Sequence, residues 1–165
     1  MISAGDSAPA VELKNIDGTS HSLATTVRQR PVLLAFFALD CLTCEMSFLF
    51  WDRIQETYGG SDFELWGVSL DSPDEARDFY ERSGVEFPVL LDEGRSVAQQ
   101  YGATATPALY LVGSDGVVLA SHEGFDRPAV NAMIETIAAQ TGREAIEIAA
   151  AEAPDLRPGC VIHFG

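Results

Sequence analysis

The chain of 165 residues is long enough for one domain, and 47% of its residues are apolar, so it can bury a hydrophobic core. Its formal net charge of −15 disfavours binding to nucleic acids and to anionic membrane surfaces. No stretch reaches the roughly 18 consecutive apolar residues of a membrane span, and the first residues lack the basic and apolar regions of a signal peptide. We therefore expect no membrane insertion and a cytoplasmic protein, or an extracytoplasmic one if a leader has been removed.

The first half of the chain predicts a hairpin followed by alternating strands and helices. Two short alternating runs flank the Asp-Gly dipeptide at 17–18, which is typical of a β-hairpin turn. The apolar run at 31–37, PVLLAFF, predicts a strand that is buried on both faces. Apolar residues then recur every four positions over 41–58, which predicts a helix, and FELWGVSL at 63–70 predicts a second strand.

The second half begins with a capping box, in which Ser72 and Glu75 start a helix that we expect to end before Gly84. The other expected elements are an extended piece at 87–92, a short helix at 95–101, strands at 107–112 and 117–123, and a helix from Asp126 to Gly142. This order predicts an α/β fold, with a mixed sheet covered by helices on both faces. We expect one domain over residues 1–141 and, because the composition changes, a C-terminal arm over residues 142–165.

Cys41 and Cys44 lie where a predicted strand gives way to a helix. The Cys41 thiol would lie beside the unpaired N–H groups and the positive end of the helix, and both favour a thiolate. One helical turn brings Cys44 to the same face. The pattern indicates a redox pair, in which Cys41 attacks a substrate disulfide and the deeper Cys44 resolves the mixed disulfide.

Two other interpretations of the pair remain open, a metal site and two unreactive buried thiols. A closed zinc site needs four ligands. The remaining soft or nitrogen ligands in the sequence are scattered, at His21, His122, Cys160 and His163. We therefore expect no metal. Cys160 is either an incidental thiol or, if the arm folds back, a third redox thiol or a link between two copies.

Thr106 and Pro107 lie at the start of a predicted strand. A proline cannot donate a hydrogen bond to a neighbouring strand, so its presence there needs a reason. A cis Thr106–Pro107 bond beside the two cysteines would supply one. From these residues alone, an ordinary trans proline is the simpler interpretation.

Taken in order, these segments resemble the thioredoxin superfamily, in the branch of TlpA/ResA-like thiol-disulfide oxidoreductases that is related to AhpC/TSA and Redoxin proteins. The resemblance runs from about Gly5 to about Ala139 and is most specific over 67–118, GVSLDSPDEARDF to GSDGVV. It implies a three-layer thioredoxin-like fold with a helix-containing central insertion. It also implies a Cys41–Cys44 redox pair and a facing cis-Pro107, which with Thr106 would bind an extended substrate chain.

The resemblance further implies the partners of the reaction. The substrates would be protein disulfides, and a thioredoxin-type or membrane reductase would return electrons to the pair. No organic cofactor is implied.

The sequence departs from this family around the cysteines. Asp40 replaces the usual tryptophan before Cys41, and its charge should disfavour the Cys41 thiolate. Leu42 and Thr43 stand between the cysteines, where the family often has proline. Two acidic residues of relatives are also replaced, by Ala35 and Ser47. Because these tuning groups are missing, we expect a reducing or weakly oxidising pair.

Two further functions remain open. A peroxiredoxin-like thiol peroxidase would have threonine three residues before its reactive cysteine and proline four residues before that. Neither cysteine has this pattern, since the corresponding residues are Ala38 and Leu34 for Cys41, and Cys41 and Phe37 for Cys44. The other alternative is a non-enzymatic metal carrier or binding module on a thioredoxin fold.

Overall fold

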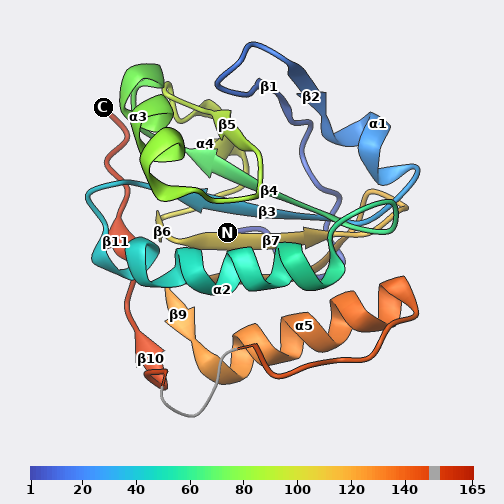
Figure 1. Ribbon diagram of the computed structural model, residues 1–165. Coiled ribbons are helices and arrows are strands. Elements are labelled where there is room, and N and C mark those ends of the chain that lie inside the picture. The colour runs from blue at the N-terminus through green and yellow to red at the C-terminus, as the bar shows by residue number, and fades with distance from the viewer. Residues whose placement is uncertain (149–152) are drawn as a thin grey trace.

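The computed structural model describes residues 1–148 and 153–165, and a mixed five-stranded sheet forms its centre (Figure 1). The strand order is β5-β4-β3-β7-β8. These strands are β3 (Val32–Phe37), β4 (Glu64–Ser69), β5 (Val89–Leu91), β7 (Ala108–Val112) and β8 (Val118–Glu123). β3 pairs in parallel with β4 and antiparallel with β7. The predicted mixed sheet is thus confirmed.

Helices cover both faces of this sheet. The helices are α1 (Leu23–Val27), α2 (Leu42–Tyr58), α3 (Pro73–Ser83), α4 (Ser96–Gln100) and α5 (Arg127–Thr141). Side chains from α2, α3 and α5 pack on one face of the sheet, and side chains from α1 and α4 pack on the other. None of the helices in the described ranges is long and apolar enough to cross a membrane.

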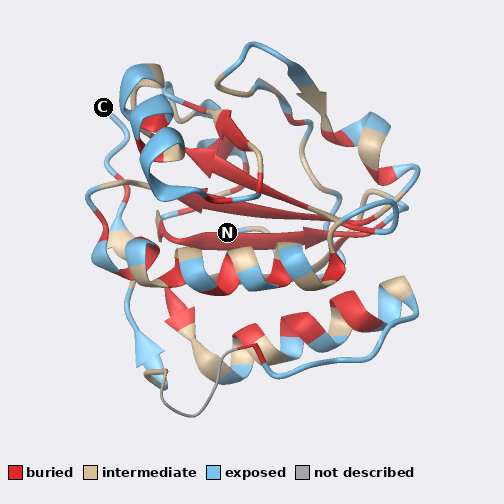
Figure 2. Ribbon diagram, in the orientation of Figure 1, coloured by how far each residue is buried: buried red, intermediate tan, exposed pale blue. Residues whose placement is uncertain are grey.

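The strand β3 lies at the middle of the core, and Figure 2 shows the central strands of the sheet as buried, whereas most of the edge strand β8 is half-buried. Successive residues point to opposite faces of a strand. Accordingly, Leu33, Ala35 and Phe37 pack beneath α2 and α5, while the alternate residues of β3 pack against α1 and α4. All six residues of β3 are buried, as the continuous apolar run predicts.

Most helix ends follow the local signals in the sequence. Ser72 and Glu75 form the predicted capping box, and Asp126 accepts a hydrogen bond from the Ala129 N–H at the start of α5. Gly84 and Gly142 adopt the left-handed conformation that ends α3 and α5. The N-terminal hairpin is also confirmed, with β1 (Glu12–Lys14) antiparallel to β2 (Ser20–Ser22). The short helix α1 was not predicted.

The C-terminal segment returns to the domain and forms two short strands that the sequence did not predict. β10 (Leu156–Arg157) pairs antiparallel with β9 (Phe125–Asp126), and β11 (Cys160–Val161) pairs antiparallel with β6 (Ala105–Thr106). In Figure 1 this segment passes the start of α2. Ile148 and Ile162, on either side of the two strands, are buried in the core.

Candidate active site

Cys41 is the N-cap residue of α2 and lies in the turn that follows β3. Its backbone is extended, and its Sγ accepts a hydrogen bond from the Cys44 N–H at 3.4 Å. The turn is held by Asp71, whose carboxylate accepts the Leu39 N–H at 3.1 Å. The expected position of Cys41 at the start of a helix is therefore confirmed, and one orphan N–H of that helix points at its sulfur.

The two thiols of the pair are both buried, with Cys41 1% exposed, but their pKa values are shifted in opposite directions. Cys44 is fully buried, and burial strongly raises its pKa, so it is a neutral thiol at neutral pH. Burial also acts to raise the pKa of Cys41. Hydrogen bonds from the Cys160 thiol, from the Cys44 thiol and N–H, and from the Thr106 side chain outweigh that effect, and the net pKa of Cys41 is lowered. Cys41 is thus the better nucleophile of the two.

The charge of Asp40 does not prevent a lowered pKa of Cys41. We expected its charge to disfavour the Cys41 thiolate, yet the net shift of the Cys41 pKa is downward. Asp40 is exposed to solvent, where charge interactions are weak. Its charge instead contributes to raising the pKa of Cys160.

The Thr106–Pro107 bond is cis, as the resemblance implied. Both residues are buried, and the Thr106 carbonyl oxygen accepts a hydrogen bond from the Cys41 thiol at 3.3 Å. The loop before the cis bond is fixed by Glu123, whose carboxylate accepts the Thr104 N–H at 2.6 Å and the Ala105 N–H at 3.4 Å. The sequence analysis missed Glu123 and Asp71, since nothing in the linear pattern shows which loop each carboxylate will reach.

The two residues between the cysteines differ in exposure. Leu42 is 71% exposed, whereas Thr43 is buried. The Thr43 hydroxyl donates a hydrogen bond to the Pro158 carbonyl at 2.8 Å. The residue after the first cysteine therefore faces solvent, and the next residue contacts the C-terminal segment.

The C-terminal segment brings Cys160 to the same site. Cys160 is the strand partner of Thr106, and hydrogen bonding from its thiol contributes to lowering the pKa of Cys41. Burial and the neighbouring Cys41 raise its pKa. A cavity of about 270 Å³ adjoins this position and is lined by Asp40, Thr106 and Cys160, among others. The site thus contains three thiols, two on α2 and its cap and one on β11.

No group of three histidine, cysteine, aspartate or glutamate side chains in residues 1–148 and 153–165 is arranged to hold a metal ion. Ser47, at the position where relatives often carry glutamate, donates its hydroxyl to the Thr43 carbonyl at 2.7 Å. The Ser47 hydroxyl is therefore bonded to a backbone carbonyl of α2.

Residues 4–121 match the AhpC/TSA family, which covers more than half of the chain. The chain belongs to this family. It is 28% identical to the thiol-disulfide oxidoreductase ResA of Geobacillus thermodenitrificans over 118 residues, which are 71% of this chain and 67% of that protein.

The solved structures that resemble this AhpC/TSA protein have a thioredoxin-like fold. A protein from Chlorobium tepidum, assigned as a thiol:disulfide interchange protein DsbE, has a TM-score of 0.78 at 29% identity, over 86% of this chain and 100% of that one. A hypothetical protein from Sinorhizobium meliloti 1021 has a TM-score of 0.76 at 20% identity, over 98% of this chain and 94% of that one. The predicted fold is confirmed, and these relatives support thiol–disulfide exchange; the peroxidase alternative is not better supported.

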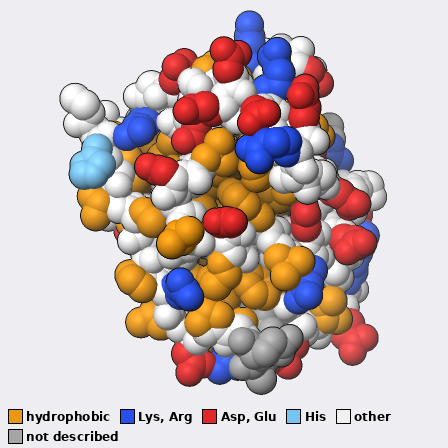
Figure 3. Space-filling model, turned by 60° about the vertical axis from the view of Figure 1, so that its left-hand side comes forward, with side chains coloured by type: hydrophobic (Ala, Val, Ile, Leu, Met, Phe, Trp, Pro, Cys, Tyr) orange, Lys and Arg blue, Asp and Glu red, His pale blue; other side chains and the backbone are white. Residues whose placement is uncertain are grey.

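Apolar side chains gather on the face of the molecule that carries the start of α2 and the C-terminal strands (Figure 3). Among the described residues, five of the seven exposed large hydrophobic side chains lie on α2, on the C-terminal strands or just after those strands, namely Leu42, Leu49, Leu156, Val161 and Phe164. Leu42 and Val161, which directly follow Cys41 and Cys160 in the chain, thus place exposed apolar side chains near the thiols, although Asp40 and Arg95 also line the adjoining cavity. Such a surface is typical of contact with other polypeptides.

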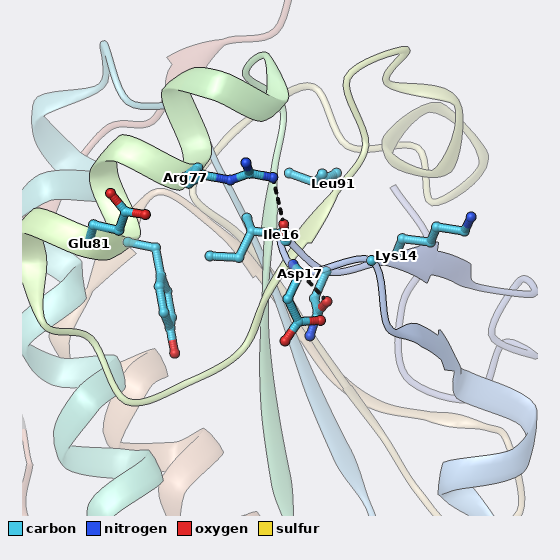
Figure 4. Close-up of a pocket in the computed structure, with 9 residues that line it drawn as sticks. Lys14, Ile16, Asp17, Arg77, Glu81 and Leu91 are labelled. Atoms are coloured by element: carbon cyan, nitrogen blue, oxygen red, sulfur yellow. Dashed lines mark hydrogen bonds between the residues drawn. The ribbon is translucent and has the colours of Figure 1, made fainter.

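A broader hollow of about 750 Å³ lies elsewhere, between the β1–β2 turn and α3 (Figure 4). Arg77 of α3 points across it and donates a hydrogen bond to the Ile16 carbonyl at 2.8 Å. Lys14, Asp17 and Glu81 also line this hollow, and no cysteine does. This hollow is larger than the cavity beside Cys160, but the candidate active site is at the cysteines, because the reactive groups lie there and the relatives are thiol-disulfide oxidoreductases.

Proposed function

We propose that this AhpC/TSA protein exchanges its Cys41–Cys44 dithiol with the disulfides of other proteins. The observation that supports this most strongly is the contrast between the two thiols: the pKa of Cys41 is lowered and that of the buried Cys44 is raised. Thiolate is the attacking species in disulfide exchange. Cys41 therefore attacks the substrate disulfide, and Cys44 attacks the resulting mixed disulfide once its proton has been removed.

The substrate binds beside the cis peptide bond. Thr106 contributes a strand edge next to Cys41, and an extended polypeptide adds to such an edge by main-chain hydrogen bonds. Pro107 fixes the direction of the chain at this point. The apolar side chains around the start of α2, such as the exposed Leu42 and Leu49, add contact area for a protein substrate.

The oxidised pair is returned to the dithiol by a thioredoxin-type or membrane reductase. Asp40, Leu42 and Thr43 adjust the pair in place of the residues usual in relatives. The cytoplasmic location expected from the sequence stays a prediction, as does a reducing or weakly oxidising potential. The lowered pKa of Cys41 stabilises the reduced pair, and this raises the reduction potential toward the weakly oxidising end of that range.

Reduction of a protein disulfide tests this function. We would measure insulin reduction with dithiothreitol as the dithiol donor, for the native protein and for the Cys41→Ser and Cys44→Ser variants, after checking that each variant is folded. We expect catalysis by the native protein, none by Cys41→Ser, and in Cys44→Ser a disulfide on Cys41 that is not converted to the Cys41–Cys44 disulfide. Rapid consumption of hydrogen peroxide without insulin reduction would instead establish the peroxidase.

A further inference from the structure

The strand edge beside Cys41 is already occupied by the protein's own C-terminal segment. β11 pairs antiparallel with β6, with Cys160 opposite Thr106 and Val161 opposite Ala105. The Ile162 N–H continues this pairing and donates to the Thr104 carbonyl at 2.9 Å. The segment lies along the edge on which the proposed function places an extended substrate.

Several contacts fix this segment in place. The Thr43 hydroxyl holds the Pro158 carbonyl, and the Arg127 N–H donates to the Asp155 carbonyl at 2.9 Å. Arg127 and Asp155 also form an ion pair. These contacts come from α2 and α5, so two elements of the domain hold the segment independently of the pairing with β6.

Glycine at two positions allows the close approach. A Cβ atom on Gly159 would lie 2.8 Å from the Thr106 carbonyl oxygen, and one on Gly124 would lie 2.8 Å from the Arg157 carbonyl oxygen. Real Cβ atoms do not come so near to backbone oxygens, so larger residues at either position would push the segment away. The fit between the segment and the edge therefore depends on particular residues on both sides.

The residue that this fit places next to the nucleophile is a cysteine. The Thr106 carbonyl contacts the Cys41 thiol at 3.3 Å, and Cys160 is the strand partner of that same Thr106. A substrate cysteine in a mixed disulfide with Cys41 would have to reach the same place.

We propose that Cys160 is a third catalytic thiol, which forms a disulfide with Cys41 while the segment 156–162 occupies the substrate edge. This inference rests on the proposed function, because it requires Cys41 to be the attacking thiol. Cys41 is only 1% exposed with the segment in place, so a disulfide substrate reaches it when the segment moves, and an extended protein chain also has to replace the segment on β6.

The chemistry balances with a disulfide substrate as the oxidant. The Cys41 thiolate attacks one sulfur of the substrate, the S–S bond breaks, and the first substrate thiolate leaves and takes up a proton. Cys160, deprotonated, then attacks Cys41 Sγ, and the second substrate thiol leaves. Two electrons pass from Cys41 and Cys160 to the substrate. Cys44 next attacks Cys41 Sγ and releases Cys160 as a thiol, which leaves the Cys41–Cys44 disulfide for the dithiol donor.

The test uses the Cys44→Ser variant, in which the last step cannot occur. The reduced full-length variant is treated with glutathione disulfide, the remaining thiols are alkylated, and the linked peptides are identified by mass. A tethered thiol competes as if present at millimolar concentration or above, so at about 0.1 mM released glutathione we expect about tenfold more Cys41–Cys160 disulfide than Cys41–glutathione adduct.

Two further substitutions in the Cys44→Ser background test whether the Cys41–Cys160 disulfide depends on the position of the segment. Gly159→Val should displace the segment and shift the product to the Cys41–glutathione adduct, with Cys160 alkylated. Gly165→Val is the matched control, since no atom lies within 4 Å of a Cβ at that position, and it should leave the product unchanged.

The outcomes separate the two claims. A stable Cys41–glutathione adduct with Cys160 alkylated in Cys44→Ser itself would overturn the role of Cys160 and leave the proposed function standing. A Cys41 that does not react with glutathione disulfide would overturn both. A Cys41–Cys160 disulfide that forms equally in Gly159→Val would overturn the dependence on the docked strand.

Discussion

Cys160 is the antiparallel strand partner of Thr106, whose carbonyl oxygen lies 3.3 Å from Cys41 Sγ. These residues are far apart in the sequence, yet together they surround the thiol with the lowered pKa. The C-terminal segment is therefore part of the site and changes both its shape and its electrostatics.

The first prediction concerns the pKa of Cys41. The Cys160 thiol is the largest contributor that lowers this pKa, so Cys160→Ala should raise it, and the thiolate should then form only at higher pH. The ultraviolet absorbance of the thiolate, followed against pH, measures this directly. Cys44 will not interfere near neutral pH because burial keeps it protonated. Asp40 and Cys44 are present at the site in both the native protein and Cys160→Ala, so the comparison reports the loss of the Cys160 thiol. A titration curve that stays in place, or moves to lower pH, would contradict the assigned hydrogen bond.

The second prediction concerns how firmly the segment is held. Thr43→Val removes the hydrogen bond to the Pro158 carbonyl, which is worth about 1 kcal/mol. Loss of that amount should raise the rate of hydrogen exchange at the Ile162 N–H about fivefold, since about 1.4 kcal/mol corresponds to a factor of ten.

Thr136→Val is the matched control for this experiment. The Thr136 hydroxyl is exposed and bonds only within its own helix, to the Ala132 carbonyl. Exchange at Ile162 should be unchanged in this variant. Equal rates in the native protein and in Thr43→Val would show that the Thr43 contact does not hold the segment.

The third prediction concerns the loop before the cis bond. Glu123→Ala removes the acceptor for two backbone N–H groups and for the Thr104 hydroxyl. Hydrogen bonds to a charged group contribute about 1.5–3 kcal/mol each, but two of these three bonds are exposed and water can replace their acceptor, so we expect a net loss of about 2 kcal/mol in the free energy of unfolding. Because Thr106 would lose its fixed position, kcat/KM for a protein disulfide should fall by about tenfold.

Glu123→Gln separates position from charge. Its amide oxygen can still accept hydrogen bonds from this loop, so most of the stability and activity should remain. Denaturant unfolding and insulin reduction measure the two effects. Full activity in Glu123→Ala would show that the loop is held by other contacts.

Local signals in the sequence predicted the elements that depend on neighbouring residues. The capping box of Ser72 and Glu75, the cap at Asp126 and the buried strand at 32–37 were confirmed because each depends on a few adjacent side chains. The position of Cys41 at a helix start followed from the change between two periodicities.

Features that depend on distant residues were not predictable in this way. Periodicity is not defined in two-residue strands, so β10 and β11 gave no signal, and their pairing depends on glycines at 124 and 159 that fit particular carbonyls. The lowered pKa of Cys41 beside Asp40 was not predicted, because hydrogen bonds from Cys160 and Thr106, which are distant in the sequence, contribute to it. The sequence allowed a third thiol at Cys160, but only the folded chain shows which residue it faces.

The reduction potential of the Cys41–Cys44 pair tests the central claim most directly. The protein would be equilibrated in glutathione and dithiothreitol buffers, and its thiols counted by mass, in the native protein and in Cys160→Ser. Thiol–disulfide exchange predicts a reversible two-electron transition between about −300 and −120 mV, the range of known redox proteins of this kind. Absence of any transition, with Cys41 and Cys44 unreactive in the folded protein, would contradict the account and leave a binding module on a thioredoxin-like fold.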